Sequence, residues 1–69
     1  MDLTCLANLA ALAVGMDASP ELEKQCHEFV AYIEKTKWHH EVRREAKAIA
    51  KLFKETIRRC SKQLRVSCP

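Results

Sequence analysis

Nine basic residues between positions 40 and 65 recur at the spacing of one face of an α-helix. Steps of three or four residues, which are all of the steps in this series but one, place side chains above one another on a helix. The sequence therefore predicts a helix over about 37–65 with a one-sided row of positive charge, about 37 Å long at 1.5 Å per residue. We call this row the basic stripe: His40, Arg43, Arg44, Lys47, Lys51, Lys54, Arg58, Lys62 and Arg65.

Two further helices are predicted upstream. The segment 3–14 is rich in Leu and Ala, and Gly15 offers a stop after it. A helix over about 20–35 has apolar residues on one face, with Ser19 as its N-cap and Pro20 at its first position. A helix as apolar as 3–14 is typical of a bundle interior or an interface. The tail 66–69 is expected to fray.

The apolar faces of segments 20–35 and 37–65 are out of phase by about 200° at 100° per residue. Either the chain breaks near Thr36 to Trp38, with Thr36 capping the third helix, or one long helix packs against different partners along its length. We favour the break, with Trp38 packed on the bundle as its anchor. In the alternative interpretation, Trp38 or His40 contacts a sugar or a base edge at one end of the stripe.

Length and composition favour an all-α fold, built as a helical hairpin or a three-helix chain. With 69 residues, 48% apolar, and only one Gly and two Pro, the chain has little turn material and a small core. A core of this size usually needs a supplement, and we expect a homodimer that closes a helical bundle. The predicted core or dimer residues are Leu6, Leu9, Phe29, Ile33, Ile49, Phe53 and Ile57.

The cysteines and the N-terminus predict an intracellular, cytoplasmic protein with reduced thiols. The Met-Asp start lacks the positive segment of a signal peptide, and the apolar stretch 3–14 is too short to span a bilayer. The four cysteines are widely scattered, at Cys5, Cys26, Cys60 and Cys68. In that compartment thiols stay reduced.

The charge is divided between the two halves of the chain. Residues 1–36 have two basic and six acidic residues, a net charge of −4, whereas residues 37–69 have ten basic and three acidic residues, a net charge of +7. Such asymmetry indicates a polyanionic partner for the basic half, although the two halves could also pair within a dimer. Lys and Arg neutralise phosphates and release counterions, so nucleic acid is the predicted partner.

The stripe predicts backbone and shape recognition. It lacks the Asn, Gln and Ser side chains of a helix that reads base edges. A single-strand binder needs exposed aromatic rings, and only Tyr32 and Trp38 are candidates. Two basic helices lying side by side in a dimer would suit double-stranded RNA, which is recognised largely by shape.

Catalytic and metal chemistry have little support in the sequence. There is no Gly-rich phosphate loop, and Cys26 and Cys60 fall on apolar faces, where thiols act as small hydrophobes. A metal site would need Cys26 and His27 to join His39, His40 or Cys60, without any zinc-type spacing. We therefore expect no enzyme, no cofactor, no metal and no small-molecule substrate.

The stretch from Val42 to Lys54, continuing to Arg58 and Arg59 after an acidic helix and an apolar first helix, resembles the small helical suppressors of RNA silencing made by nodaviruses. The resemblance implies a dimeric bundle that lays basic helices along double-stranded RNA in an infected cell and shields it from Dicer. It implies that phosphates and 2′-hydroxyls are gripped by Arg43, Arg44, Lys47, Lys51, Lys54 and Arg58. Rop-like RNA-binding helix-hairpin dimers are similar in size, but they lack the additional apolar helix.

Two other functions stay open. In a protein-interaction module, the first helix or the face around Phe53 would dock onto a larger partner, and the stripe would only be a solvated face. A basic amphipathic helix could also lie on an anionic membrane or be captured by calmodulin. Phe53, Ile57 and Leu64 would suit that role, but the core needs the same residues.

Overall fold

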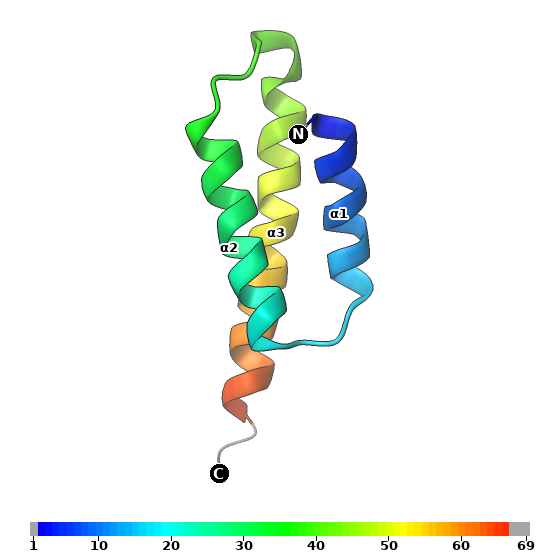
Figure 1. The fold of residues 1–69 in the computed structure, drawn as a ribbon, viewed down its shortest axis with the longest axis vertical. Helices are drawn as coiled ribbons and strands as arrows, with labels where there is room; N and C mark the ends of the chain where they lie inside the picture. Colours follow the sequence, from blue (N-terminus) through cyan, green and yellow to red (C-terminus); the bar gives the residue numbers. More distant parts are fainter. Residues whose placement is uncertain (1, 67–69) are drawn as a thin grey trace.

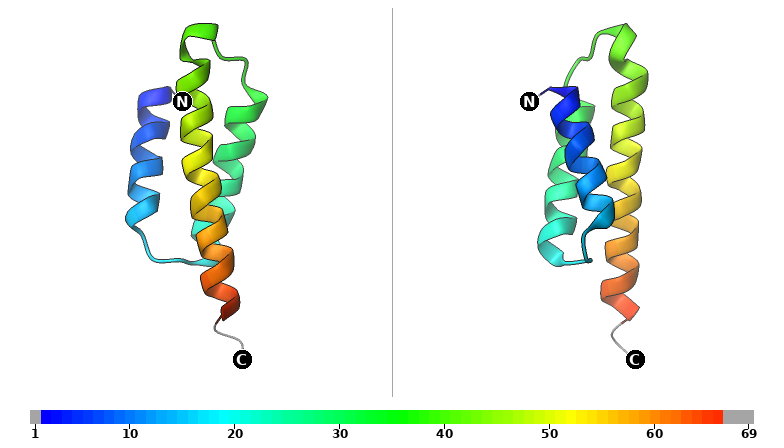
Figure 2. Two further views of the ribbon diagram at one scale, coloured as in Figure 1. Left: turned by 180° about the vertical axis from the view of Figure 1, so that it is seen from behind. Right: turned by 90° about the vertical axis from the view of Figure 1, so that its right-hand side faces the viewer.

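The chain folds into three α-helices, described here from a computed structural model that covers residues 2–66, with the backbone alone for 65 and 66. The helices are α1 (Leu3–Gly15), α2 (Pro20–Lys35) and α3 (His40–Val66). Helix α3 is central, because α1 and α2 both pack along it but barely touch each other (Figure 1; Figure 2). The predicted all-α class is confirmed in its three-helix form, and the dimer stays a prediction.

The first two helices begin at residues that satisfy their free N–H groups. The Asp2 carboxylate accepts a hydrogen bond from Cys5 N at 2.8 Å, and the Ser19 hydroxyl accepts one from Leu22 N at 3.1 Å. Ser19 and Pro20 hold the predicted N-cap and first positions of α2. Helix α1 runs one residue further than predicted, since Gly15 is its last helical residue and has no positive φ.

The chain breaks between α2 and α3 over residues 36–39, near Thr36 to Trp38 as we favoured, but Thr36 ends α2 instead of starting α3. Thr36 caps the C-terminus of α2, with its backbone N–H and its hydroxyl both donating to Tyr32 O, at 3.1 and 2.8 Å. The third helix begins at His40 rather than at 37, so the prediction that Thr36 starts it is wrong. Thr36 has an extended backbone with ψ of 137°, and it therefore leaves the helical path.

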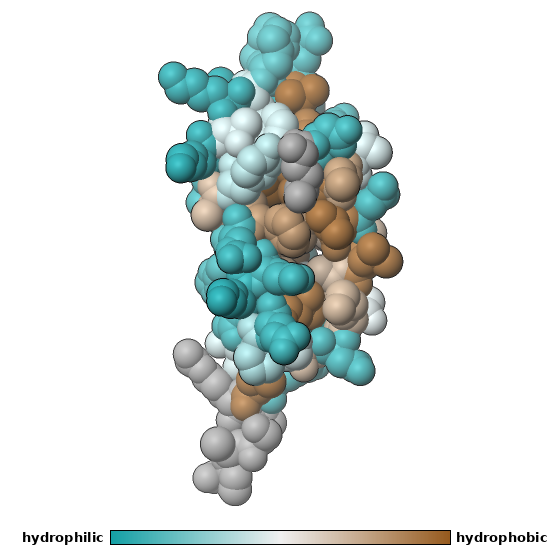
Figure 3. All heavy atoms as spheres, viewed as in Figure 1, coloured by the Kyte–Doolittle hydropathy of each residue, from teal (hydrophilic) through white to brown (hydrophobic). Residues whose placement is uncertain are grey.

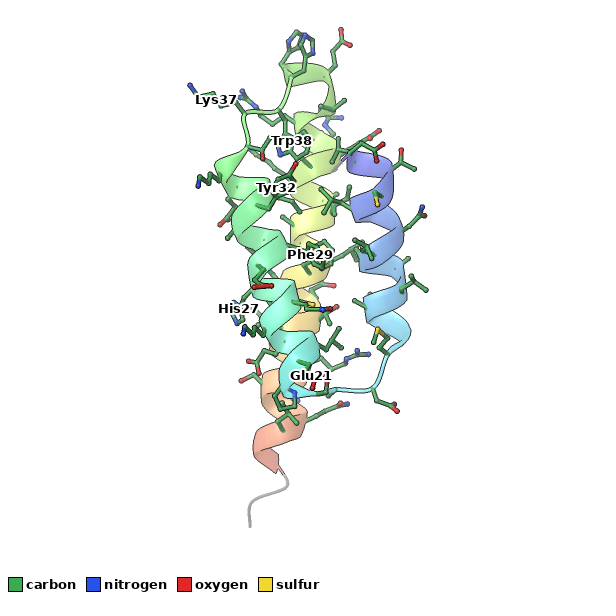
Figure 4. The ribbon with its side chains drawn as sticks, viewed as in Figure 1. Glu21, His27, Phe29, Tyr32, Lys37 and Trp38 are labelled. Atoms are coloured by element: carbon green, nitrogen blue, oxygen red, sulfur yellow. The ribbon has the colours of Figure 1, made fainter. Side chains whose placement is uncertain are left out.

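Trp38 anchors this connection, as expected. Its indole N–H donates to Ile33 O at 2.9 Å, and its ring meets that of Tyr32 edge-on at 6.4 Å. Figure 4 shows Trp38 turned in toward the bundle and Lys37 pointing out of it. The half-buried ring packs against the core. The break lets α3 present its own apolar face to α2, which removes the phase mismatch seen in the sequence.

The core closes within a single chain. Of the residues predicted for it, Leu6, Ile33, Ile49 and Phe53 are buried. The other three, Leu9, Phe29 and Ile57, are partly buried and pack against that core. The rings of Phe29 and Phe53 stack with centroids 5.1 Å apart, which joins α2 to α3 at mid-height.

Arg59 fixes the C-terminus of α1 to α3. Its guanidinium donates to Val14 O at 2.6 Å, Ala13 O at 3.1 Å and Met16 O at 2.8 Å. The last turn of α1 has no basic residue of its own. Arg59 therefore supplies the positive charge and the donors that the carbonyl end of a helix favours.

Candidate nucleic-acid interface

The stripe lies on one exposed sector of α3. All eight of its members whose side chains the structure describes are exposed, and they are His40, Arg43, Arg44, Lys47, Lys51, Lys54, Arg58 and Lys62. At 100° per residue they occupy a sector about 100° wide. The ninth, Arg65, has a side chain outside the described part. The helix thus brings together the predicted site residues that can be placed.

A groove runs beside the stripe, between α3 and the C-terminal half of α2. Its volume is about 760 Å³. Four stripe residues line it together with Lys37 of the connection, and they are Arg43, Lys47, Lys51 and Lys54. The floor comes from Ile33, Ala46 and Ala50, which are themselves buried, and Glu34, Thr36 and Trp38 complete the walls beside the cations. The groove suits an extended anionic strand.

Acidic residues are mostly kept away from the groove. The three acids of α3, Glu41, Glu45 and Glu55, fall outside the stripe's sector on the helix. Glu34 of α2 lines the groove, and its carboxylate lies 3.1 Å from Lys54 Nζ. Both side chains are more than half exposed, so water screens this pair and phosphate can compete for the lysine.

Sequence reasoning missed Lys37 and Glu34 as parts of the groove. Lys37 follows the cap of α2, and only the path of the connection brings it over α3. Glu34 faces α3 because α2 packs antiparallel on it. The alternating charges of α2 in the sequence were a signal for an exposed helix, but they did not identify which acid would meet the stripe.

The two histidines beside Trp38 are exposed at the start of α3. Their rings lie 4.4 Å apart, and the backbone N–H of Glu41 donates to His39 Nδ1 at 3.3 Å. Among residues 2–66, the metal-ligating types gather in one group of three, His39, His40 and Glu41, with ligand atoms within 4.8 Å of one another. His27 lies apart from it, exposed on the outer side of α2 (Figure 4).

Cys26 and Cys60 are buried, in keeping with the apolar faces on which they were placed, and Cys5 is exposed. All three are free thiols, whereas Cys68 lies outside the described residues. Burial raises the pKa of the Cys26 thiol above its ordinary value of 9.0; nearby Cys60 adds to the rise and Arg59 opposes it. A thiol kept protonated in this way is a poor nucleophile.

Within residues 2–66, no helix combines the length and the hydrophobicity needed to cross a bilayer. Comparisons with protein-family models, with curated proteins and with solved structures found no match to this chain. The groove and the stripe are therefore the features of this chain that point to a function.

Proposed function

We propose that this protein binds double-stranded RNA along the basic stripe, by charge and shape and without reading base sequence. The observation that carries the proposal is the exposure of eight basic side chains in one sector of a 27-residue helix. Like charges three or four residues apart repel on a helix, each pair costing about 0.2–0.5 kcal/mol. The attraction between these cations and the phosphates of a polyanion lying along α3 would offset that repulsion.

The chemistry of the stripe favours a duplex over a single strand. Base stacking needs free aromatic faces, whereas the rings of Tyr32 and Trp38 meet each other edge-on at 6.4 Å, and Trp38 is half-buried with its N–H bonded to Ile33 O. The stripe offers cations and one imidazole, which bind phosphate oxygens and 2′-hydroxyls, and it lacks the Asn and Gln side chains that read adenine edges. The wide, shallow minor groove of A-form RNA is recognised through such contacts.

A protein bound along RNA in this way would hinder enzymes that cut duplexes. That activity is the one implied by the resemblance to nodavirus suppressors of silencing, which act in the cytoplasm of an infected cell. We extend the proposal to this role, with the chain acting as a homodimer.

The test is a binding titration of duplex RNA, duplex DNA and single strands of the same sequence at two salt concentrations. We expect duplex RNA to bind most tightly. Changing both Lys47 and Lys51 to Ala should weaken binding about equally for different sequences and lower the salt slope by about one per lysine. The matched control changes Lys24 and Lys35 of α2 to Ala, which removes the same charge from exposed positions outside the groove.

A gain-of-affinity variant sharpens the same experiment. Glu34→Gln removes the acid from the groove and releases Lys54 from its pair. We expect binding to tighten by about 1.4-fold to fivefold, since an exposed pair is worth about 0.2–1 kcal/mol. Equal affinity of the wild type, the stripe variant and Glu34→Gln would refute the proposal.

The second candidate is a protein-interaction module, and the exposed apolar side chains of α1 favour it. Leu12 is 64% exposed. In that case a partner captured from a host extract should still bind the Lys47 and Lys51 variant, and no duplex should shift at either salt concentration.

A further inference from the structure

Helix α1 lies at the edge of the bundle although nearly its whole surface is apolar. The segment Leu3–Gly15 has no charged residue, and it packs along α3 with little contact to α2. As a result Leu12 is 64% exposed, and the C-cap residue Met16 is 52% exposed. Figure 3 shows apolar side chains gathered over α1 and its seam with α2. Exposed apolar patches of this kind mark interaction sites.

The seam between α1 and α2 has a protruding side chain beside a hollow. The hollow has a volume of about 90 Å³, and Leu9, Met16, Leu22 and Phe29 are among the residues that line it. Leu12 stands at its rim and is mostly exposed. A twofold interface uses the same patch on both subunits, so the protruding side chain of each copy would lie opposite the hollow of the other.

We propose that this seam, defined by Leu9, Leu12, Met16 and Phe29, is the interface of a homodimer in which Leu12 of each protomer enters the hollow of the other. The occupant is a second copy because the patch complements itself and is uncharged. A twofold axis places identical groups opposite each other, which would set like charges against one another on any charged face. On α1, a twofold axis brings only apolar and uncharged polar groups opposite each other.

The size of the chain supports the same occupant. The core of a chain of 69 residues rarely supplies more than about 3–5 kcal/mol, and Cys5, Cys26 and Cys60 form no disulfide to supplement it. Helix α1 is about 20 Å long at 1.5 Å per residue, so the seam is small beside a standard interface of about 800 Å² per partner. We therefore expect weak association, with monomers at low protein concentration and dimers at high protein concentration.

Pairing through the seam leaves the basic groove free. The groove is lined by α2, α3 and the residues that connect them, and no residue of α1 contributes to it. The dimer would therefore carry two separate grooves rather than two basic helices side by side. The inference does not rest on RNA binding, because it depends only on the apolar seam.

The test measures mass in solution by sedimentation and light scattering over a range of protein concentrations, without RNA. We expect the wild type to shift from monomer to dimer as concentration rises. Leu12→Glu should raise the dimer dissociation constant at least about tenfold, because pairing would desolvate a carboxylate with no partner. Circular dichroism should show unchanged helix content, since residue 12 is mostly exposed in one protomer.

Two further variants make the result decisive. Ala31→Glu introduces the same charge at an exposed position of α2, about 200° around the helix from Phe29, and should leave the dimer intact. Met16 lies outside the helix, so Met16→Glu tests the seam if Leu12→Glu does not fold. A wild type that stays monomeric at NMR concentrations, or folded seam variants that dimerise like the wild type, would overturn the inference. The Lys47 and Lys51 variant should dimerise normally, which separates this result from the RNA test.

Discussion

Arg58 and Arg59 are adjacent in the sequence but face different surroundings. Arg58 is exposed in the basic stripe, whereas Arg59, about 100° further around α3, donates three hydrogen bonds to the end of α1. The Nε atom of Arg59 is buried without a partner among the described residues. The cost of burying this N–H offsets part of the stabilisation from the three hydrogen bonds. Arg59 therefore has a structural role, whereas Arg58 has the binding role that we propose for the stripe.

We predict that Arg59→Ala lowers the free energy of unfolding by about 2 kcal/mol, because charge-assisted hydrogen bonds to the α1 carbonyls are lost. Urea denaturation followed by circular dichroism measures the change. Arg59→Lys keeps the charge without the planar fork and should lose about half as much. Arg58→Ala is the matched control and should change stability by less than about 0.5 kcal/mol. Equal stabilities of the two alanine variants would contradict the assignment.

The buried thiol of Cys26 predicts a loss of stability in alkaline solution. The unfolded thiol releases its proton near pH 9.0, while burial raises the pKa in the folded chain, which keeps its proton longer. Above that pH the unfolded state binds fewer protons, so the free energy of unfolding falls as pH rises. In Cys26→Ala this contribution is absent, and the decline should be shallower. Cys5→Ala, which removes an exposed thiol, should decline as steeply as the wild type.

At the scale of single elements, short polar contacts decide where each helix begins and ends. The Ser19 hydroxyl satisfies the N–H of Leu22, and Pro20 at the first position has no N–H to satisfy. At the other end of α2, Thr36 and Trp38 donate to the last carbonyls of the helix. On the α3 side, His39 Nδ1 accepts a hydrogen bond from Glu41 N. The short connection of residues 36–39 is thus bonded to both helices, which favours the antiparallel pairing of α2 and α3.

We predict that Ser19→Ala destabilises the protein by about 1 kcal/mol, because the N–H of Leu22 loses its side-chain acceptor. Thermal and urea denaturation provide the measurement. Ser19→Asp retains an acceptor and adds a negative charge at the helix N-terminus, so it should be at least as stable as the wild type. If Asp and Ala at this position destabilise equally, the hydroxyl is not acting as a cap.

At the scale of the whole molecule, the bundle is a tight α2–α3 hairpin with a peripheral helix. The hairpin shares the longest contact, with the Phe29 and Phe53 rings stacked at its centre, whereas α1 adds a shorter contact held at its end by Arg59. Opening α1 would expose less buried surface than separating α2 from α3. The three helices should therefore differ in local stability.

We predict that amide hydrogens of α1 exchange through openings of lower free energy than those of α2 and α3. Native-state hydrogen exchange followed by NMR at low denaturant would separate the two groups. Raising the protein concentration should slow exchange in α1 if the seam dimerises. Exchange of all three helices at the free energy of global unfolding would contradict this picture.

The helices, the Ser19–Pro20 boundary and the one-sided stripe could all be predicted from the order of the amino acids. These depend on caps and on the 3.6-residue period, which are local properties of the chain. The start of α3 at His40, the partner of Arg59 and the entry of Lys37 and Glu34 into the groove were decided by tertiary structure. Each requires contact between residues far apart in the chain or a particular path of the connection. Local sequence patterns do not determine how helices are placed against one another, because that placement depends on packing across the whole core.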